Sequence, residues 1–147
     1  MAEPVRATEE QMTALIAAAI KARSSAYAPY SDHPVGAAVL DENGVISAGA
    51  NIENAAYPLS NCAEPTALGN MVLAGGSRVI HIVIAGPSDA LCTPCGGCRQ
   101  RIREFAAHGE ARVTVVDRDG TILKTYDFFE ELLPDSFGPD NVESVRS

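Results

Sequence analysis

The sequence of 147 residues lacks a long uninterrupted run of apolar side chains. A helix that crosses a bilayer needs about 20 consecutive, mostly apolar residues, so we expect no transmembrane helix and no membrane partner. The opening segment, Met1 to Arg6, also lacks the basic region and apolar core that mark a secretory signal. These two absences predict a cytoplasmic protein in a reducing setting.

Basic residues are few in this sequence. Eleven Lys and Arg side chains stand against nineteen Asp and Glu, which gives a formal charge of -8. That charge repels a phosphate backbone unless basic residues gather locally. The only basic run is Arg99, Arg101 and Arg103, and we interpret Arg101 and Arg103 as a solvated helix face. We therefore expect no nucleic acid polymer among the partners.

Cysteines are also few, four in all, and the chain does not need them as disulfides. A domain of this size buries roughly 68 to 70 per cent of the surface that its unfolded chain exposes. In a reducing setting the cysteines are therefore expected as thiolates rather than disulfides. We find no internal repeat and no linker in the sequence, so we predict a single domain over residues 1–147, with a loose tail over 138–147.

Helical and strand-like segments alternate along the chain. Thr8 and Gln11 form a capping box ahead of an apolar stripe with helical spacing, and Asn43-Gly44 is typical of a β-hairpin turn. The expected elements are a helix after Thr8, strands at 35–40 and 45–51, a helix from Cys62 to Gly75, a strand at 79–85, a helix that has Thr93 as its N-cap and ends before Gly109, a strand at 112–116 and a short helix at 126–133.

Residues 79–85 form a short, nearly continuous run of β-branched side chains, interrupted by His81. Such a run is typical of a strand that is covered on both faces, so we expect it at the centre of the sheet. Together the elements predict an α/β sandwich around a mixed sheet, antiparallel at the hairpin and parallel beyond it.

Two cysteine clusters stand at the predicted starts of helices: Asn61-Cys62-Ala63-Glu64 and Thr93-Pro94-Cys95-Gly96-Gly97-Cys98. Residues three apart on a helix face the same way, with about 5 to 6 Å between Cβ atoms, so Cys95 and Cys98 are placed to bind one ion. Helix N-termini favour thiolate over thiol. Three thiolates suit Zn²⁺ and leave its fourth position open for a water molecule. Glu64, two residues after Cys62, is close enough to act on that water.

Other interpretations of these residues are open at this point. Cys92 would complete a closed, structural four-cysteine zinc site, or with the two cysteines after it an iron–sulfur run, although the downstream cysteine and proline of that run are missing. Glu64 would satisfy only a backbone N–H if Asn61-x-x-Glu64 were an ordinary capping box. We favour the catalytic zinc, with Cys92 as a small buried side chain. The histidines that lack ligand spacing, and default to structural or surface roles, are His33, His81 and His108.

A Cys-x-Glu motif followed by Pro-Cys-x-x-Cys is the signature of zinc-dependent deaminases of nucleobases, and it predicts hydrolytic deamination. With these motifs the chain resembles the small cytidine deaminases that act on free nucleosides, of the three-cysteine type. The further segments that match this family, in its order, are Tyr27-Ala28-Pro29-Tyr30-Ser31, Pro34-Val35-Gly36-Ala37-Ala38, Asn51-Ile52-Glu53-Asn54-Ala55-Ala56-Tyr57 and Leu132-Leu133-Pro134-x-x-Phe137. The resemblance implies a three-layer α/β/α sandwich around a mixed five-stranded sheet.

The resemblance also implies a division of roles. Cys62, Cys95 and Cys98 would bind Zn²⁺, and Glu64 would carry a proton from water to N3 of the base and then to the departing amine. Cytidine or deoxycytidine would yield uridine or deoxyuridine and ammonia, as in pyrimidine salvage. The implied substrate-binding residues are Asn51 and Glu53 on the ribose hydroxyls, the Ala63 N–H on the base carbonyl, His33, and Ala55, Tyr57 and Phe137 partly across subunit contacts. The family is mostly homotetrameric, so active sites shared between subunits are implied.

Two positions depart from the family's pattern. His33 stands where the family usually has phenylalanine against the base, and imidazole is smaller, polar and able to charge near neutral pH. Pro65 stands where three-cysteine members usually have arginine, and proline offers the thiolates no donor; Arg99 is the candidate replacement. These changes leave open a modified cytidine or related amino-heterocycle as substrate, as in the blasticidin S deaminases. A non-enzymatic, zinc-stabilised binding module is the remaining alternative.

Overall fold

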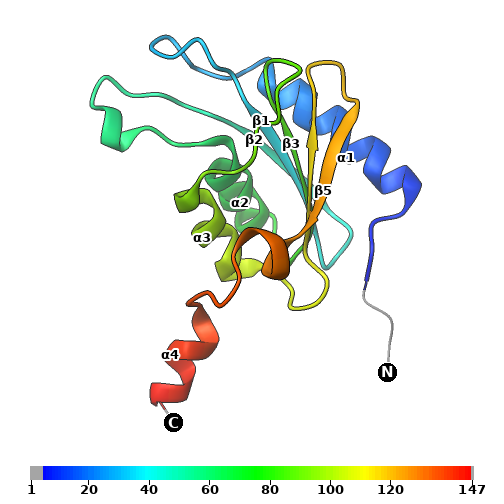
Figure 1. Ribbon diagram of the computed structural model, residues 1–147, viewed down its shortest axis with the longest axis vertical. Helices are drawn as coiled ribbons and strands as arrows, with labels where there is room; N and C mark the ends of the chain where they lie inside the picture. Colours follow the sequence, from blue (N-terminus) through cyan, green and yellow to red (C-terminus); the bar gives the residue numbers. More distant parts are fainter. Residues whose placement is uncertain (1–4, 147) are drawn as a thin grey trace.

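The computed structural model describes residues 5–146, which form one five-stranded sheet with the strand order β2-β1-β3-β4-β5 (Figure 1). The elements are α1 (Glu9–Arg23), β1 (Gly36–Asp41), β2 (Ile46–Ala50), the 3-10 helix η1 (Tyr57–Leu59), α2 (Ala63–Leu73), β3 (Val79–Ala85), α3 (Gly96–Phe105), β4 (Arg112–Val116), β5 (Ile122–Asp127), the π-helical turn η2 (Phe128–Leu132) and α4 (Pro139–Arg146). Figure 1 shows α1 on one face of the sheet and α2 and α3 on the other. The predicted three-layer α/β/α sandwich around a five-stranded sheet is therefore confirmed. Within residues 5–146, no helix is both long and apolar enough to cross a membrane.

The sheet combines parallel and antiparallel pairs. β1 runs antiparallel to β2 and to β3, β3 runs parallel to β4, and β4 runs antiparallel to β5. Every residue of β3 is buried, which confirms the predicted central strand. The expectation of parallel pairing beyond the hairpin holds only for β3 and β4, because β5 pairs antiparallel with β4.

The periodicity of the sequence did not indicate β5. A helix was expected at 126–133, but Tyr126 and Asp127 end β5, and only Phe128–Leu132 is helical, as a single π-type turn. The first four residues of β5 are exposed, so this edge strand shows no alternation of buried apolar and exposed polar side chains. Main-chain pairing with β4 holds β5 in the sheet.

The central strand contributes side chains to two cores. Ile82 and Ile84 belong to the core beneath α2 and α3, together with the fully buried Phe128. Ile80 and Val83 belong to the core beneath α1. Burying one such side chain contributes roughly 1.5 to 3 kcal/mol, so the apolar run of β3 holds both helix layers to the sheet.

Two glycines let helices approach the sheet closely from opposite faces. A Cβ atom on Gly36 in β1 would lie 1.9 Å from the carbonyl oxygen of Ala19 in α1. A Cβ atom on Gly49 in β2 would lie 2.4 Å from the backbone nitrogen of Ala67 in α2. A side chain at either position would push a helix off the sheet. These glycines therefore set the spacing of the layers and, through α2, the position of its N-terminus.

Arg103 corrects the expectation of a solvated arginine face on α3. Only 4% of its surface is exposed, whereas Arg101 is exposed as predicted. Its Nε donates to Ser136 Oγ (2.9 Å), its Nη2 donates to Asp140 Oδ1 (2.9 Å), and its guanidinium lies 4.9 Å from the centre of the Phe129 ring. Asp140 belongs to the first turn of α4, a helix in the segment 138–147 where we expected a loose tail.

Candidate metal centre and active site

Three cysteine thiols meet at the N-termini of α2 and α3. Cys62 is the N-cap of α2, Cys95 is the N-cap of α3, and Cys98 lies in the first turn of α3. Their Sγ atoms all lie within 4.8 Å of one another. The structure thus brings together the three residues that the sequence predicts as metal ligands.

Cys62 and Cys95 occupy equivalent positions in their helices. Both have extended backbone, with φ -71° and ψ 167° for Cys62 and φ -67° and ψ 169° for Cys95, and neither side chain makes a capping hydrogen bond. The prediction of Thr93 as the N-cap of this helix was wrong, because the N-cap is Cys95 and the first helical bond runs from Arg99 N to Cys95 O (2.9 Å). Both thiols are therefore free for an ion and lie at the positive end of a helix dipole, which favours thiolate.

The donor set and its surroundings fit Zn²⁺. Zinc binds cysteine sulfur at about 2.3 Å, which places two sulfurs of a tetrahedral site roughly 3.8 Å apart, and the observed group is nearly that compact. Cys98 is fully buried while Cys62 and Cys95 are exposed, so one side of the group opens to solvent. Burial raises the pKa of Cys62 and Cys98; burial also opposes ionisation of Cys95, but hydrogen bonds with Cys98 lower its pKa. A bound dication would offset the charge of three thiolates here.

Glu64 is the acidic group beside the thiols. It is the second residue of α2, and only 4% of its surface is exposed. Burial raises the pKa of its carboxyl group, which suits a residue that takes up and releases a proton near neutral pH. The capping-box alternative does not apply, because the N-cap is Cys62 and the third helical residue is Pro65.

An open cavity of about 490 Å³ adjoins the thiol group. Its volume lies within the range of roughly 300 to 1,000 Å³ typical of small-molecule sites. The cavity is lined by Ser31, His33, Val35, Asn51, Glu53, Cys62, Ala63, Glu64, Cys92, Thr93 and Cys95. The predicted substrate-binding residues among these are His33, Asn51, Glu53 and Ala63. No substrate-binding role was predicted for Ser31, Val35 and Thr93, although each lies in a segment that the sequence analysis singled out.

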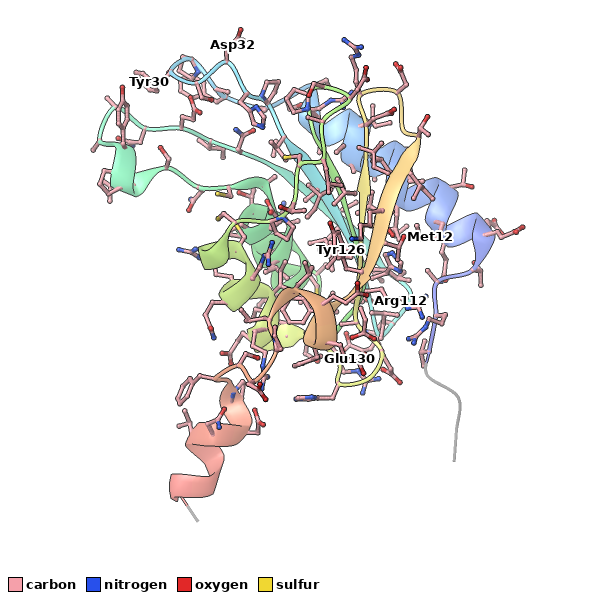
Figure 2. The ribbon with its side chains drawn as sticks, in the orientation of Figure 1. Met12, Tyr30, Asp32, Arg112, Tyr126 and Glu130 are labelled. Carbon is pink, nitrogen blue, oxygen red and sulfur yellow. The ribbon has the colours of Figure 1, made fainter. Side chains whose placement is uncertain are left out.

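Asn51 and Glu53 also hold the loop that borders the cavity. Asn51 accepts a bond from Val35 N (2.8 Å) and donates one to His33 O (3.0 Å). Glu53 accepts bonds from Tyr30 N (2.9 Å), Ser31 N (3.1 Å) and the Ser31 hydroxyl. The Ser31 hydroxyl is the main reason that the pKa of Glu53 is lowered. Figure 2 shows this loop, with Tyr30 labelled, at the edge of the molecule.

Cys92 lies outside the three-thiol group. It is half-buried rather than fully buried as expected, and it lines the cavity. Its Sγ is 3.8 Å from His33 Nε2. The thiols that lie close enough to share an ion are Cys62, Cys95 and Cys98, so the closed four-cysteine site and the iron–sulfur run do not match the arrangement.

Three predicted substrate-binding residues lie away from this cavity. Ala55 is exposed, and 70% of Tyr57 and 63% of Phe137 are exposed. Tyr57 lines a separate hollow of about 330 Å³ and meets Tyr30 edge to face, with ring centres 5.7 Å apart. The carbonyl of Phe137 accepts a bond from Gln100 Nε2 on α3 (2.9 Å). Within one chain, these side chains do not line the cavity.

Arg99 and Pro65 both occupy structural positions. The Nε of Arg99 donates to Pro94 O (2.8 Å) and its Nη1 donates to Leu132 O (3.0 Å). These bonds tie α3 to the preceding loop and to η2. Pro65 lines a groove between α2 and α3 instead of the cavity. The guanidinium of Arg99 is therefore engaged with carbonyl groups, and the helix N-termini are the positive groups beside the thiols.

Comparison with known proteins agrees with this arrangement. Residues 9–115 match the family described as the cytidine and deoxycytidylate deaminase zinc-binding region. The chain is 41% identical to the cytidine deaminase of Sporosarcina psychrophila over 87% of this chain and 92% of that protein. It is 40% identical to the cytidine deaminase of Halalkalibacterium halodurans over 87% and 95%. The solved cytidine deaminase of Burkholderia pseudomallei is 39% identical, with a TM-score of 0.77 over 85% of this chain and 98% of that chain. In sequence and in structure, the chain belongs to the cytidine deaminase family.

Proposed function

We propose that this protein catalyses the zinc-dependent hydrolytic deamination of cytidine or deoxycytidine to uridine or deoxyuridine and ammonia, as a step of pyrimidine salvage. The observation that carries the proposal is the meeting of three thiols with a buried glutamate at the wall of a cavity of nucleoside size. Relatives that bear the name cytidine deaminase match this chain over most of their length, which supports the same reaction here.

The thiols of Cys62, Cys95 and Cys98 would hold Zn²⁺. When bound, the ion supplies a Lewis acid that makes water a usable nucleophile near neutral pH. The N-termini of α2 and α3 sustain the thiolate form, because both N-caps are cysteines. We therefore assign the stabilisation of the thiolates to the helix dipoles, because Pro65 offers the thiolates no hydrogen-bond donor.

Glu64 is the residue that moves protons in this proposal. Its carboxylate takes a proton from the attacking water and passes it to N3 of the pyrimidine while the water oxygen bonds to C4. The second proton of that oxygen then travels through the same carboxyl group to the amino nitrogen, which leaves as ammonia when the C4–N bond breaks. One water is consumed for each nucleoside. The raised pKa of Glu64 keeps both protonation states of the carboxyl within reach.

The polar groups of the cavity wall suit a nucleoside. Ala63 is the first residue of α2, so its backbone N–H has no acceptor within the helix and is offered to the base carbonyl. Asn51 retains a second amide hydrogen beyond its bond to His33 O. Glu53 is held in place by backbone N–H groups on one side. We assign Asn51 and Glu53 to the ribose hydroxyls and His33 to the base.

We assign a homotetramer with shared active sites to this chain. Tyr57 and Phe137 are exposed away from the cavity of their own chain, as residues that complete a neighbour's site would be. A groove of about 660 Å³ between α2 and α3 is lined in part by Leu68, Val72 and Phe105, and such apolar exposure is typical of a subunit contact. The four cysteines are all free, which supports the cytoplasm as the compartment.

A modified cytidine or related amino-heterocycle is the second candidate substrate. It is favoured by the contact between His33 Nε2 and Cys92 Sγ at the cavity wall, which presents the base with an imidazole and a thiol. A substituent on the base would find polar partners there. Initial rates for cytidine, N4-substituted cytidines and blasticidin S decide between the two, since a clearly fastest reaction with plain cytidine excludes the second candidate.

The test of the main proposal is the ultraviolet change and ammonia release when zinc-loaded protein meets cytidine. Glu64→Gln is expected to lower kcat by about 10²- to 10⁴-fold while its zinc content stays unchanged. Glu130→Gln alters an exposed glutamate far from the cavity and serves as the matched control with full activity. Wild-type turnover by Glu64→Gln would contradict the assigned role, and a zinc-loaded wild type inactive on every nucleoside would contradict the function.

A further inference from the structure

A second cavity, of about 460 Å³, lies at the opposite end of the sheet from the thiol group. His81 of β3 and Arg112 of β4 are register partners at this end, whereas the thiol group adjoins the end where β1 begins and β3 finishes. The lining residues are Arg6, Ala7, Met12, His81, Arg112, Thr114 and Thr125. Figure 2 shows Met12 and Arg112 on the side of the molecule that carries α1. We call this the basic cavity.

The basic cavity carries two guanidinium groups and no carboxylate on its described walls. Arg6 donates from Nη1 to the backbone carbonyls of Glu110 (2.9 Å) and Val5 (3.2 Å), which are neutral acceptors. The Nε of Arg112 is buried and has no hydrogen-bond partner. Among residues 5–146, no ion pair involves either arginine.

Two acidic residues lie close to these arginines but do not line the basic cavity. Asp127 is the register partner of Arg112, but its Oδ1 accepts a bond from Glu130 N (3.3 Å) at the start of η2. Glu110 accepts a bond from Val5 N (3.4 Å) on Oε1, and its Oε2 lies 3.9 Å from Arg78 Nη2. Among the described residues, the carboxylates of Asp127 and Glu110 therefore lie beside the basic cavity, and its walls carry only the two guanidinium charges.

Polar side chains form one wall of the basic cavity. His81 Nε2 lies 2.7 Å from Thr114 Oγ1, which lies 2.9 Å from Thr125 Oγ1. Only 6% of the His81 surface is exposed. Burial, and then the charges of Arg112 and Arg6, lower the pKa of His81 to about 4, so the ring is neutral at pH 7. The positive charges of Arg6 and Arg112 therefore both act on this polar wall of the basic cavity.

We propose that the basic cavity binds a phosphate group. Phosphate oxygens accept charge-assisted bonds from two guanidinium groups at once, and the neighbouring threonine hydroxyls can complete the shell. The formal charge of -8 repels anions from the rest of the protein, so capture depends on Arg6 and Arg112. The volume exceeds that of inorganic phosphate, which leaves room for the organic part of a small phosphomonoester.

The test is an amide NMR titration of the zinc-loaded protein with inorganic phosphate, ribose 5-phosphate and uncharged ribose. We expect saturable shifts at the amides of His81, Arg112 and Thr114 with both phosphates and none with ribose. Tighter binding of ribose 5-phosphate would identify a phosphomonoester as the ligand, and tighter binding of inorganic phosphate would identify the free ion. Absence of saturable shifts at these amides would overturn the proposal.

Two variants and a control locate the site. Arg112→Gln is expected to weaken phosphate binding by about tenfold, through the loss of one charge-assisted contact. Arg118→Gln removes an arginine paired with Asp89 outside the cavity and should bind as the wild type does. Cytidine turnover or the melting temperature checks that each variant is folded. If Arg112→Gln does not fold, Thr125→Val decides, and unchanged binding by that variant would overturn the proposal. The amide shifts do not depend on turnover, so a failure of the proposed reaction leaves this test intact.

Discussion

The thiol group and the basic cavity share one sheet but lie at its opposite ends. The thiol group belongs to α2 and α3, which Figure 1 shows on the face of the sheet opposite to α1. The thiol group stands on the N-termini of α2 and α3, where backbone N–H groups favour negative charge. The basic cavity stands on β3, β4 and β5, beside the part of the sheet that α1 leaves uncovered because it packs on β1, β2 and β3. One site is therefore organised by helix ends and the other by strand ends.

The difference concerns how charge is compensated. At the thiol end, the thiols and Glu64 have positive helix ends beside them, and burial raises the pKa of the Glu64 carboxyl group. At the basic end, the guanidinium groups of Arg6 and Arg112 have only carbonyl partners or none. The first site needs a cation to complete it and the second needs an anion.

The largest effect is expected from removal of one thiol. Cys98→Ser should lose zinc and lower cytidine turnover by more than about 10³-fold, because water without the ion has a pKa of about 15.7 instead of about 7. Cys92→Ser is the matched control and should retain both zinc and turnover, since Cys92 lies outside the three-thiol group. The measurement is zinc content by mass spectrometry beside initial rates.

The same pair of variants separates an enzyme from a zinc-stabilised binding module. Release of zinc by Cys92→Ser would indicate a closed four-cysteine site and contradict the open one. Phosphate binding at the basic cavity should survive in Cys98→Ser if the protein stays folded, because the two sites share no residue.

A smaller effect is expected at the basic end, in the dependence of stability on pH. The pKa of His81 is about 4 in the folded protein, against an ordinary value of 6.5. Between these values the unfolded chain binds more protons, so the free energy of unfolding falls as pH falls from about 6.5 to about 4, by about 3 kcal/mol in all. Above pH 6.5 this contribution is fully present.

His81→Gln tests that dependence. Denaturant midpoints of the wild type and the variant, both zinc-loaded and in phosphate-free buffer, should converge as the pH is lowered from 7 to 5. Acid also weakens zinc binding, but both proteins share the same zinc site, so the difference between them isolates His81. Parallel curves for the two proteins would contradict the prediction.

The two ends also differ in how far the sequence predicts them. The thiol end is encoded in two short motifs, with Glu64 two residues after Cys62 and Cys98 three residues after Cys95. Its chemistry can therefore be predicted before the fold is known. The apolar run of β3 predicts a strand covered on both faces, because burial there leaves no polar position other than His81. Local patterns suffice for these features.

The basic end depends on contacts between distant segments. Arg6, His81 and Arg112 meet only because the segment before α1 lies against β3 and β4. β5, which supplies Thr125, was missed because its first four residues are exposed. Arg103 was expected to be solvated because its partner Asp140 lies far along the chain. The hydrophobic periodicity of a sequence carries no information about partners so far apart, so these contacts could not be predicted from it.

The smallest effects come from one hydroxyl at each end. Ser31→Ala removes the hydroxyl that donates to Glu53 and accepts from His33 N (3.1 Å). This variant should raise the KM for cytidine several-fold. Its denaturant midpoint should change little, because the loop is exposed. Thr125→Val removes the bond to Thr114 and should lower the free energy of unfolding by about 0.5 to 1 kcal/mol with unchanged kinetics. An altered KM in Thr125→Val would show that the two ends are coupled, and an unchanged KM in Ser31→Ala would show that its hydroxyl does not hold Glu53 for the substrate.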